Sequence, residues 1–161
     1  MRRRLRSLMV GELVNIPLQA GIWFGMIGFP LTWANLAGFA LFSLLLIQGA
    51  AYWAAKLDQL RNRRSLPRGL AVFALARKVN PALLGAGLLA TGAAVVTDPG
   101  GGSWPGLAFA LFAVLEQINY FSAQLMHDTA ADLRRLRTVG FRRSQLARDL
   151  ARHGAASRTT A

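Results

Sequence analysis

The sequence predicts an all-α membrane protein: a bundle of four transmembrane helices with both termini in the cytoplasm (N-in/C-in). Three observations support this fold class. Hydrophobic residues make up 53% of the 161 residues, two long apolar blocks are each divided by a turn motif, and all 19 basic residues lie outside those blocks. Such a complete separation of apolar from basic residues is typical of a multi-pass membrane protein.

The two apolar blocks predict the number of spans. Residues 7–55 contain one charged side chain, and residues 79–127 contain two. Each block is about twice the roughly 20 residues that cross a bilayer once. The motifs "GFPLTW" and "TDPGGGSWPG" place a turn near the middle of each block. The predicted transmembrane domain, residues 1–128, therefore has spans at about 9–29, 32–55, 80–97 and 104–127.

The basic residues predict the orientation. Four precede the first span, seven lie between the second and third spans, and eight follow the fourth, which accounts for all 19. Because cytoplasmic segments of membrane proteins carry the excess of Lys and Arg, both termini and residues 57–78 are expected in the cytoplasm. The excess of Arg over Lys is typical of a GC-rich bacterial genome. The expected location is therefore the inner (plasma) membrane of a bacterium.

The first residues, "MRRRLRSLMV", also have the pattern of a secretory signal peptide. However, Glu12 and Pro17 interrupt the apolar stretch that such a peptide needs, and the apolar block continues far beyond its length. We therefore interpret residues 9–29 as a transmembrane span. The sequence contains no cysteine, which excludes disulfides and thiolate chemistry.

The basic C-terminal segment predicts contact with the membrane surface. Leucines at helical spacing in residues 129–153 indicate basic amphipathic helices in the cytoplasm or at the interface, and residues 154–161 are expected to be disordered. Arg-rich tails also bind nucleic acid, but topology and attraction to anionic lipid headgroups explain this one. No nucleic-acid partner is predicted. The residues expected to contact headgroups are Arg2, Arg3, Arg4, Arg63, Arg64, Arg134, Arg135, Arg142 and Arg143.

Polar side chains follow one face of the first predicted span and one face of the fourth. The spacing of these residues places each set on a single helical stripe. Because an unpaired polar group is costly in lipid, the two stripes are expected to face each other as a polar seam. Its predicted members are Glu12, Asn15, Gln19 and Trp23 on the first helix, and Glu116, Asn119, Tyr120, Gln124 and His127 on the fourth.

A simple register follows if these two helices are antiparallel neighbours. Residues whose numbers sum to about 139 would lie at the same depth, which pairs Glu12 with His127 and Trp23 with Glu116. Glu116 is expected to face the bundle interior, close to Tyr120. The fourth helix is predicted to be polar on this one face only.

Two interpretations of the seam remain open. A seam that only holds the helices together predicts a non-enzymatic subunit or scaffold, and so small a bundle is expected to form a homo-oligomer or to join a larger membrane complex. Alternatively, an acidic residue inside a span marks an ion, proton or substrate route, and Glu116 would then serve a small proton- or cation-coupled transporter or channel. The only histidines are His127 and His153, and there is no catalytic or metal-ligand motif. Neither an enzyme nor a cofactor is predicted.

Overall fold

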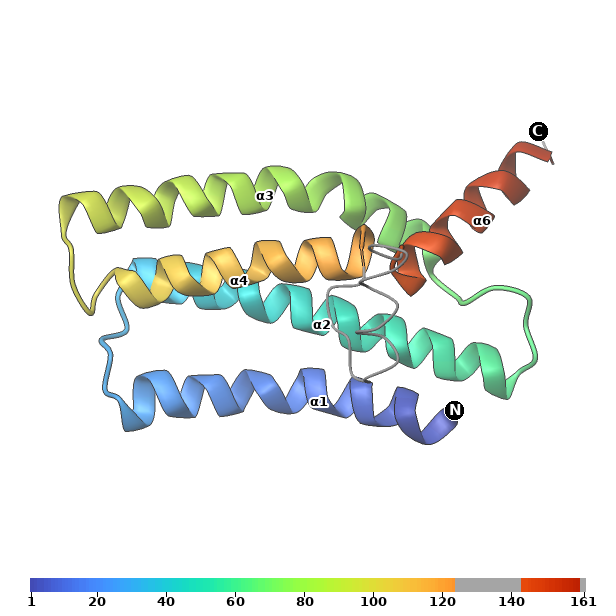
Figure 1. Ribbon diagram of the computed structural model, residues 1–161, viewed down its shortest axis with the longest axis horizontal. Coiled ribbons are helices and arrows are strands. Elements are labelled where there is room, and N and C mark those ends of the chain that lie inside the picture. The colour runs from blue at the N-terminus through green and yellow to red at the C-terminus, as the bar shows by residue number, and fades with distance from the viewer. Residues whose placement is uncertain (124–142, 160–161) are drawn as a thin grey trace, which may run out of the picture.

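The computed structural model describes residues 1–123 and 143–159, and this part of the chain is helical without a β-strand (Figure 1). An isolated bridge pairs Ala123 with Arg143. The prediction of an all-α fold is confirmed for the described residues. The elements are α1 (Arg2–Ala20), the π-helix η1 (Gly21–Met26), α2 (Trp33–Arg61), α3 (Leu70–Thr97), α4 (Trp104–Phe121) and α6 (Gln145–Thr159).

Helix α2 is the central element of the bundle. It packs against α1, α3 and α4, while α6 packs against α3 and α4. Figure 1 shows that α1 runs antiparallel to α2 and that α4 runs parallel to it. The N-terminus, the α2–α3 connection and α6 lie at one end, which we call the basic end because it carries the described basic segments. The α1–α2 and α3–α4 connections lie at the opposite, turn end.

Two of the helices are candidate membrane spans. With 29 and 28 residues, α2 and α3 are long and apolar enough to cross a membrane. Helix α2 contributes more buried residues than any other described helix, among them the fully buried side chains of Leu45, Leu46 and Tyr52. By contrast, α3 leaves several large apolar side chains exposed.

Helix α3 begins at Leu70 rather than near residue 80, where the third span was predicted to start. Pro81 therefore lies inside the helix, although proline removes a hydrogen bond there and strains the preceding turn. Tertiary contacts outweigh this cost, because Leu70 and Phe73 are buried in the core. Gly69, with a φ of 75°, supplies the left-handed turn that precedes the helix.

Helix α4 ends at Phe121, before the predicted end of the fourth span at residue 127. Ser144, just before α6, hydrogen-bonds to the carbonyl groups at this end. Its backbone N–H donates to the Ser122 carbonyl at 3.1 Å, and its hydroxyl donates to the Tyr120 carbonyl. Carbonyls that a longer helix would satisfy are therefore bonded to the start of α6.

Helix α6 continues to Thr159, so part of the segment that was expected to be disordered is helical. Leu146 and Leu150 are buried in the main core, which anchors the first turns of the helix. Once a helix is nucleated, each added residue gains a hydrogen bond at little further cost. The first half of the predicted amphipathic segment, residues 129–142, lies outside the described residues.

The turn end is held by direct backbone contact between α2 and α4. Gly38 and Gly106 face each other, and a Cβ atom on Gly38 would collide with the Gly106 carbonyl group. Beside them, the fully buried Asn35 accepts a hydrogen bond from the Gly106 N–H at 2.8 Å. Its amide group donates to the carbonyls of Pro30 at 2.8 Å and Gly101 at 2.9 Å. One side chain thus joins the start of α4 to both connections of the turn end.

We predict that Gly38→Ala separates α2 from α4 and destabilises the protein. Overpacking a core usually costs about 1–3 kcal/mol, and here the obstacle is backbone that has little room to yield. Gly85→Ala is the matched control, because an added Cβ on this α3 glycine meets nothing within 4 Å. Thermal unfolding in detergent, followed by circular dichroism, should show a lower midpoint for the first variant alone. Equal midpoints would contradict the proposed contact.

Candidate functional site

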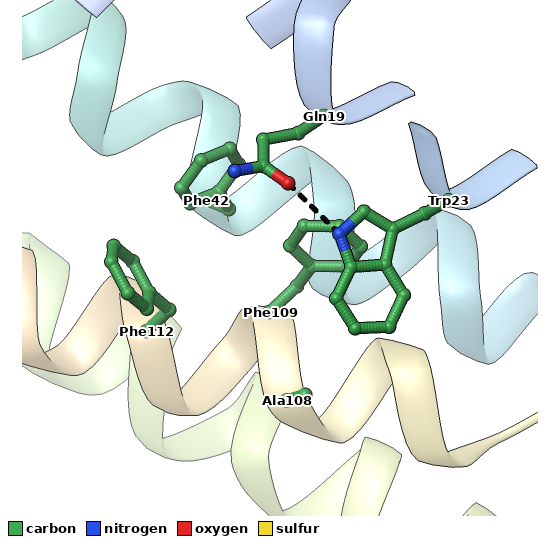
Figure 2. A pocket seen from close by; sticks show the side chains of 6 residues that line it. All are labelled: Gln19, Trp23, Phe42, Ala108, Phe109 and Phe112. Carbon is green, nitrogen blue, oxygen red and sulfur yellow. Dashed lines mark hydrogen bonds between the residues drawn. The ribbon is translucent and has the colours of Figure 1, made fainter. Parts of the chain in front are cut away.

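A small pocket lies between the end of α1, η1, α2 and α4. Its volume is about 160 Å³, and we call it the aromatic pocket. The Trp23 ring meets the Phe109 ring edge-on, with centroids 5.4 Å apart. Figure 2 shows the Trp23 indole N–H directed at the side-chain oxygen of Gln19, to which it donates a 2.8 Å hydrogen bond. The lining residues are Gln19, Trp23, Phe42, Ala108, Phe109 and Phe112.

The polar stripe of the first helix is paired along its own length. Besides accepting from Trp23, Gln19 donates to the Asn15 side chain at 3.4 Å. These residues are four apart, and side chains at this spacing are neighbours on a helix surface. These hydrogen bonds are therefore internal to the first helix and η1. The predicted seam gave these groups partners on the fourth helix instead.

The predicted register between the first and fourth helices is wrong by about two turns. Trp23 lies against Phe109 rather than beside Glu116, seven residues further along α4. Toward the basic end, Glu12 lies beside Glu116 and Tyr120. The prediction treated α1 and α4 as direct neighbours with matched ends. Instead both helices pack against α2, and the contact at Gly38 sets how far α4 extends along it.

Two carboxyl groups from different helices meet beside α2. Glu12 of α1 and Glu116 of α4 are close enough to repel each other, and we call them the carboxyl pair. The Tyr120 hydroxyl lies beside both carboxyl groups, and the Trp53 indole N–H faces Glu12. Neither the Tyr120 hydroxyl nor the Trp53 N–H makes a hydrogen bond of ordinary geometry, although both atoms are buried.

Tyr120 owes its position to a glycine on α2. Its side chain is 6% exposed, and its hydroxyl oxygen would lie 2.6 Å from a Cβ atom on Gly49. Any larger residue at position 49 would push the ring aside. The absence of a side chain on Gly49 thus allows the phenol to reach the carboxyl pair.

The other predicted seam residues lie in different surroundings. Asn119 donates a 3.3 Å hydrogen bond to Glu116, so it supports the carboxyl pair from within α4. Gln124 and His127 lie outside the described residues. The carboxyl pair itself is half-buried, as are Asn15, Gln19, Trp23 and Asn119, whereas Tyr120 is buried.

A second polar cluster, which was not predicted from the sequence, joins three helices. Asn80 of α3 donates 2.8 Å hydrogen bonds to the side chains of Gln48 on α2 and Gln117 on α4. Gln48 returns a 3.3 Å bond to Asn80. We call these residues the amide cluster. Helix α4 therefore has two polar faces, and the prediction of a single polar face is wrong. The sequence did contain a signal for this second polar face, because Gln117 lies off the predicted stripe.

A buried ion pair attaches α6 to the bundle. Asp149 of α6 lies 2.7 Å from the Lys56 ammonium group and accepts a 2.7 Å hydrogen bond from the Tyr52 hydroxyl. All three residues are at least nine-tenths buried. Because Leu146 and Leu150 of the same helix also join the core, α6 is part of the packed bundle at its basic end.

The predicted headgroup-binding arginines lie at the basic end where they are described. Arg2 donates a 3.2 Å hydrogen bond to the Leu60 carbonyl. With Leu57, Asp58 and Arg61, it also lines an open hollow of about 470 Å³. Arg134, Arg135 and Arg142 lie outside the described residues. The exposed members are Arg2, Arg3, Arg4, Arg63, Arg64 and Arg143.

Comparison with protein-family models, with curated proteins and with solved structures finds no match to this chain. Functional inference therefore starts from the residues described above.

We predict that Asp149→Asn releases α6 from the bundle. Removing one partner of a buried ion pair typically costs about 3–5 kcal/mol, because the other charge stays buried without compensation. Detachment of α6 would return Lys56 to water and relieve this cost. Hydrogen exchange should therefore show faster exchange of the α6 amides.

Arg152→Gln, on the exposed side of α6, is the control and should leave this exchange unchanged. The double variant Lys56→Met/Asp149→Leu removes both charges and should restore most of the protection. Unchanged protection in Asp149→Asn would show that the ion pair does not hold α6.

Proposed function

We propose that the chain is a four-span protein of a bacterial inner membrane that acts as a non-enzymatic subunit or scaffold of a membrane assembly. Both termini lie in the cytoplasm, and α1 with η1, α2, α3 and α4 are the four spans. The observation that carries the membrane placement is the apolar outer surface of the bundle. Val14 on α1 is 53% exposed, and Leu89 and Val96 on α3 are 77% and 83% exposed. Soluble proteins rarely expose large contiguous apolar patches.

The distribution of charge supports the orientation. The described basic residues lie in the first turns of α1, the end of α2, the α2–α3 connection, the first three turns of α3 (Arg77 and Lys78), and in or just before α6. These segments share one end of the bundle. The turn end carries Asp98 as its charged side chain among the described residues. By the positive-inside rule, the basic end faces the cytoplasm.

The outward face of α3 supports association with a second copy or another subunit. Ala82, Ala86 and Ala90 are exposed and recur at four-residue spacing, so they form a narrow strip of small side chains. In lipid, such strips let helix backbones approach closely, and van der Waals packing then stabilises the association. The amide cluster supports the structural role within one chain, because its hydrogen bonds join α2, α3 and α4.

A second candidate function is a small proton- or cation-coupled carrier or channel. The observation that favours it is the carboxyl pair, since acidic residues inside a span are costly and usually mark an ion or proton route. The Tyr120 hydroxyl, which lies beside both carboxyl groups, belongs to the same group of polar side chains. A purely structural seam would be expected to satisfy all of its buried donors.

We predict that the basic end faces the cytoplasm and the turn end faces outward. Ser65 and Gly100 are exposed at the two ends, and the chain has no cysteine to interfere. Cysteine introduced at Gly100 should react with a membrane-impermeant maleimide on intact cells. Cysteine at Ser65 should react only after permeabilisation. The opposite pattern would overturn the orientation.

We predict that Glu116→Gln distinguishes the two candidate functions. A subunit should form a detergent-solubilised particle heavier than the 17.4 kDa chain, with the same mass in the variant, because glutamine keeps the shape and hydrogen bonding of the side chain. A carrier should give proteoliposomes a proton or cation flux that the variant loses. Asp98→Asn, in the exposed turn, is the matched control. A monomeric particle with a flux abolished by Glu116→Gln would contradict the subunit function.

A further inference from the structure

We propose that the open hollow at the basic end binds the headgroup of one phospholipid, a phosphate ester that also carries a primary ammonium group. The hollow, of about 470 Å³, lies between the start of α1 and the last turns of α2 (Figure 1) and is lined by Arg2, Leu57, Asp58 and Arg61. Such a site requires the membrane placement proposed above. It goes beyond a general attraction of basic segments to anionic lipid, because one set of side chains selects one headgroup chemistry.

Two arginines from different helices provide the donors for the phosphate. Arg2 is held in place by its 3.2 Å hydrogen bond to the Leu60 carbonyl, one of the last four carbonyls of α2, which have no partner within the helix. A guanidinium group has five N–H donors, so this bond leaves most of them for a ligand. Arg61, the last residue of α2, makes no side-chain hydrogen bond or ion pair with the described residues. Both guanidinium groups can therefore donate to the oxygens of one phosphate group.

Asp58 adds a negative charge to the hollow, and this charge narrows the class of ligand. One of its carboxylate oxygens accepts a 2.5 Å hydrogen bond from the Asn62 side chain, whereas the other is buried without a hydrogen-bond partner. Within the described part of the chain, neither arginine forms an ion pair with Asp58. A simple anion would leave this carboxylate without a partner and would be repelled by it. A ligand with an ammonium group a few bonds from its phosphate would supply that partner, so the charges of the hollow match a zwitterionic phosphate ester.

The depth of the hollow fits the headgroup layer of a bilayer. The second span is expected to end near residue 55, and Leu57 and Arg61 follow soon after it on the same helix. At a rise of 1.5 Å per residue, these two side chains begin about 3–9 Å beyond the hydrocarbon core. The polar layer on each side of that core is about 5–8 Å thick. Leu57 lies one turn closer to the core than Arg61, on the side from which the acyl chains of a bound lipid would come.

Native mass spectrometry of the detergent-solubilised full chain tests the proposal with phosphatidylethanolamine, phosphatidylglycerol and phosphatidylcholine that have the same acyl chains. The glycerol lipid lacks the cation, and the trimethylated cation of the choline lipid donates no hydrogen bond. We expect the ethanolamine lipid to bind about threefold or more tightly than either, which is the scale of one partly exposed ion pair. Equal binding of the three lipids, or no binding, would overturn the proposal. Soluble glycerophosphoethanolamine should bind more weakly than the lipid, and equal binding would show that the ligand is a free phosphate ester instead.

Variants test the residues directly, with circular dichroism to show that each one is folded. Arg2→Gln and Arg61→Gln should each weaken binding of phosphatidylethanolamine about threefold or more. Arg3→Gln is the matched control and should leave binding unchanged, because it removes an exposed arginine that does not line the hollow.

Asp58→Asn should have opposite effects on two lipids. It should weaken binding of phosphatidylethanolamine, whose ammonium group loses its partner, and strengthen binding of phosphatidylglycerol, because the hollow becomes more positive. A purely structural role of Asp58 would change both lipids in the same direction. That result, or an equal loss of binding in Arg3→Gln, would overturn the site. Neither result would alter the labelling pattern or the particle mass that test the proposed function.

Discussion

The close contact between α2 and α4 is the constraint on which the rest of the structure depends. Gly38 and Gly106 bring two backbones together without side chains between them, and Asn35 hydrogen-bonds to the α4 backbone at the same point. A contact of this kind leaves α4 little freedom to slide, since any shift would bring side chains into the space that the glycines leave. The depth of every residue on α4 is therefore set at the turn end of the bundle.

Two polar clusters follow from this one register. Further along the same two helices, Gln48 and Gln117 both bond to Asn80, and Tyr120 meets Gly49. In the amide cluster, Asn80 makes hydrogen bonds to both glutamines and stays almost fully buried. The carboxyl pair is different, because it brings two acidic side chains of like charge close to each other. In a low-dielectric environment the first arrangement stabilises the fold, whereas like charges held close together raise its free energy.

The sequence was sufficient to predict the all-α fold and the clustering of basic segments, because composition and charge distribution determine both directly. It could not predict the register of α4, since that depends on Gly38 and Gly106, two glycines without any periodic signal to relate them. The first residue of α3 could not be predicted for a similar reason. Pro81 favours a helix start locally, and only the burial of Leu70 and Phe73 shows that the helix begins earlier. The seam was predicted to pair across two helices, but residues four apart on the first helix satisfied one another.

The way α1 is attached explains why the carboxyl pair remains half-buried. At the basic end, Leu5 is buried and Arg2 hydrogen-bonds to the Leu60 carbonyl of α2. At the turn end, the Phe24 and Trp23 rings pack against aromatic side chains of α2 and α4. Between these two anchors, Asn15 and Gln19 bond to their neighbours on the first helix and η1 and draw α1 no closer to α4. With both ends held against the bundle, the middle of α1 cannot move toward α4 without breaking one of the anchors. The open side of the carboxyl pair is thus a consequence of how the bundle is built.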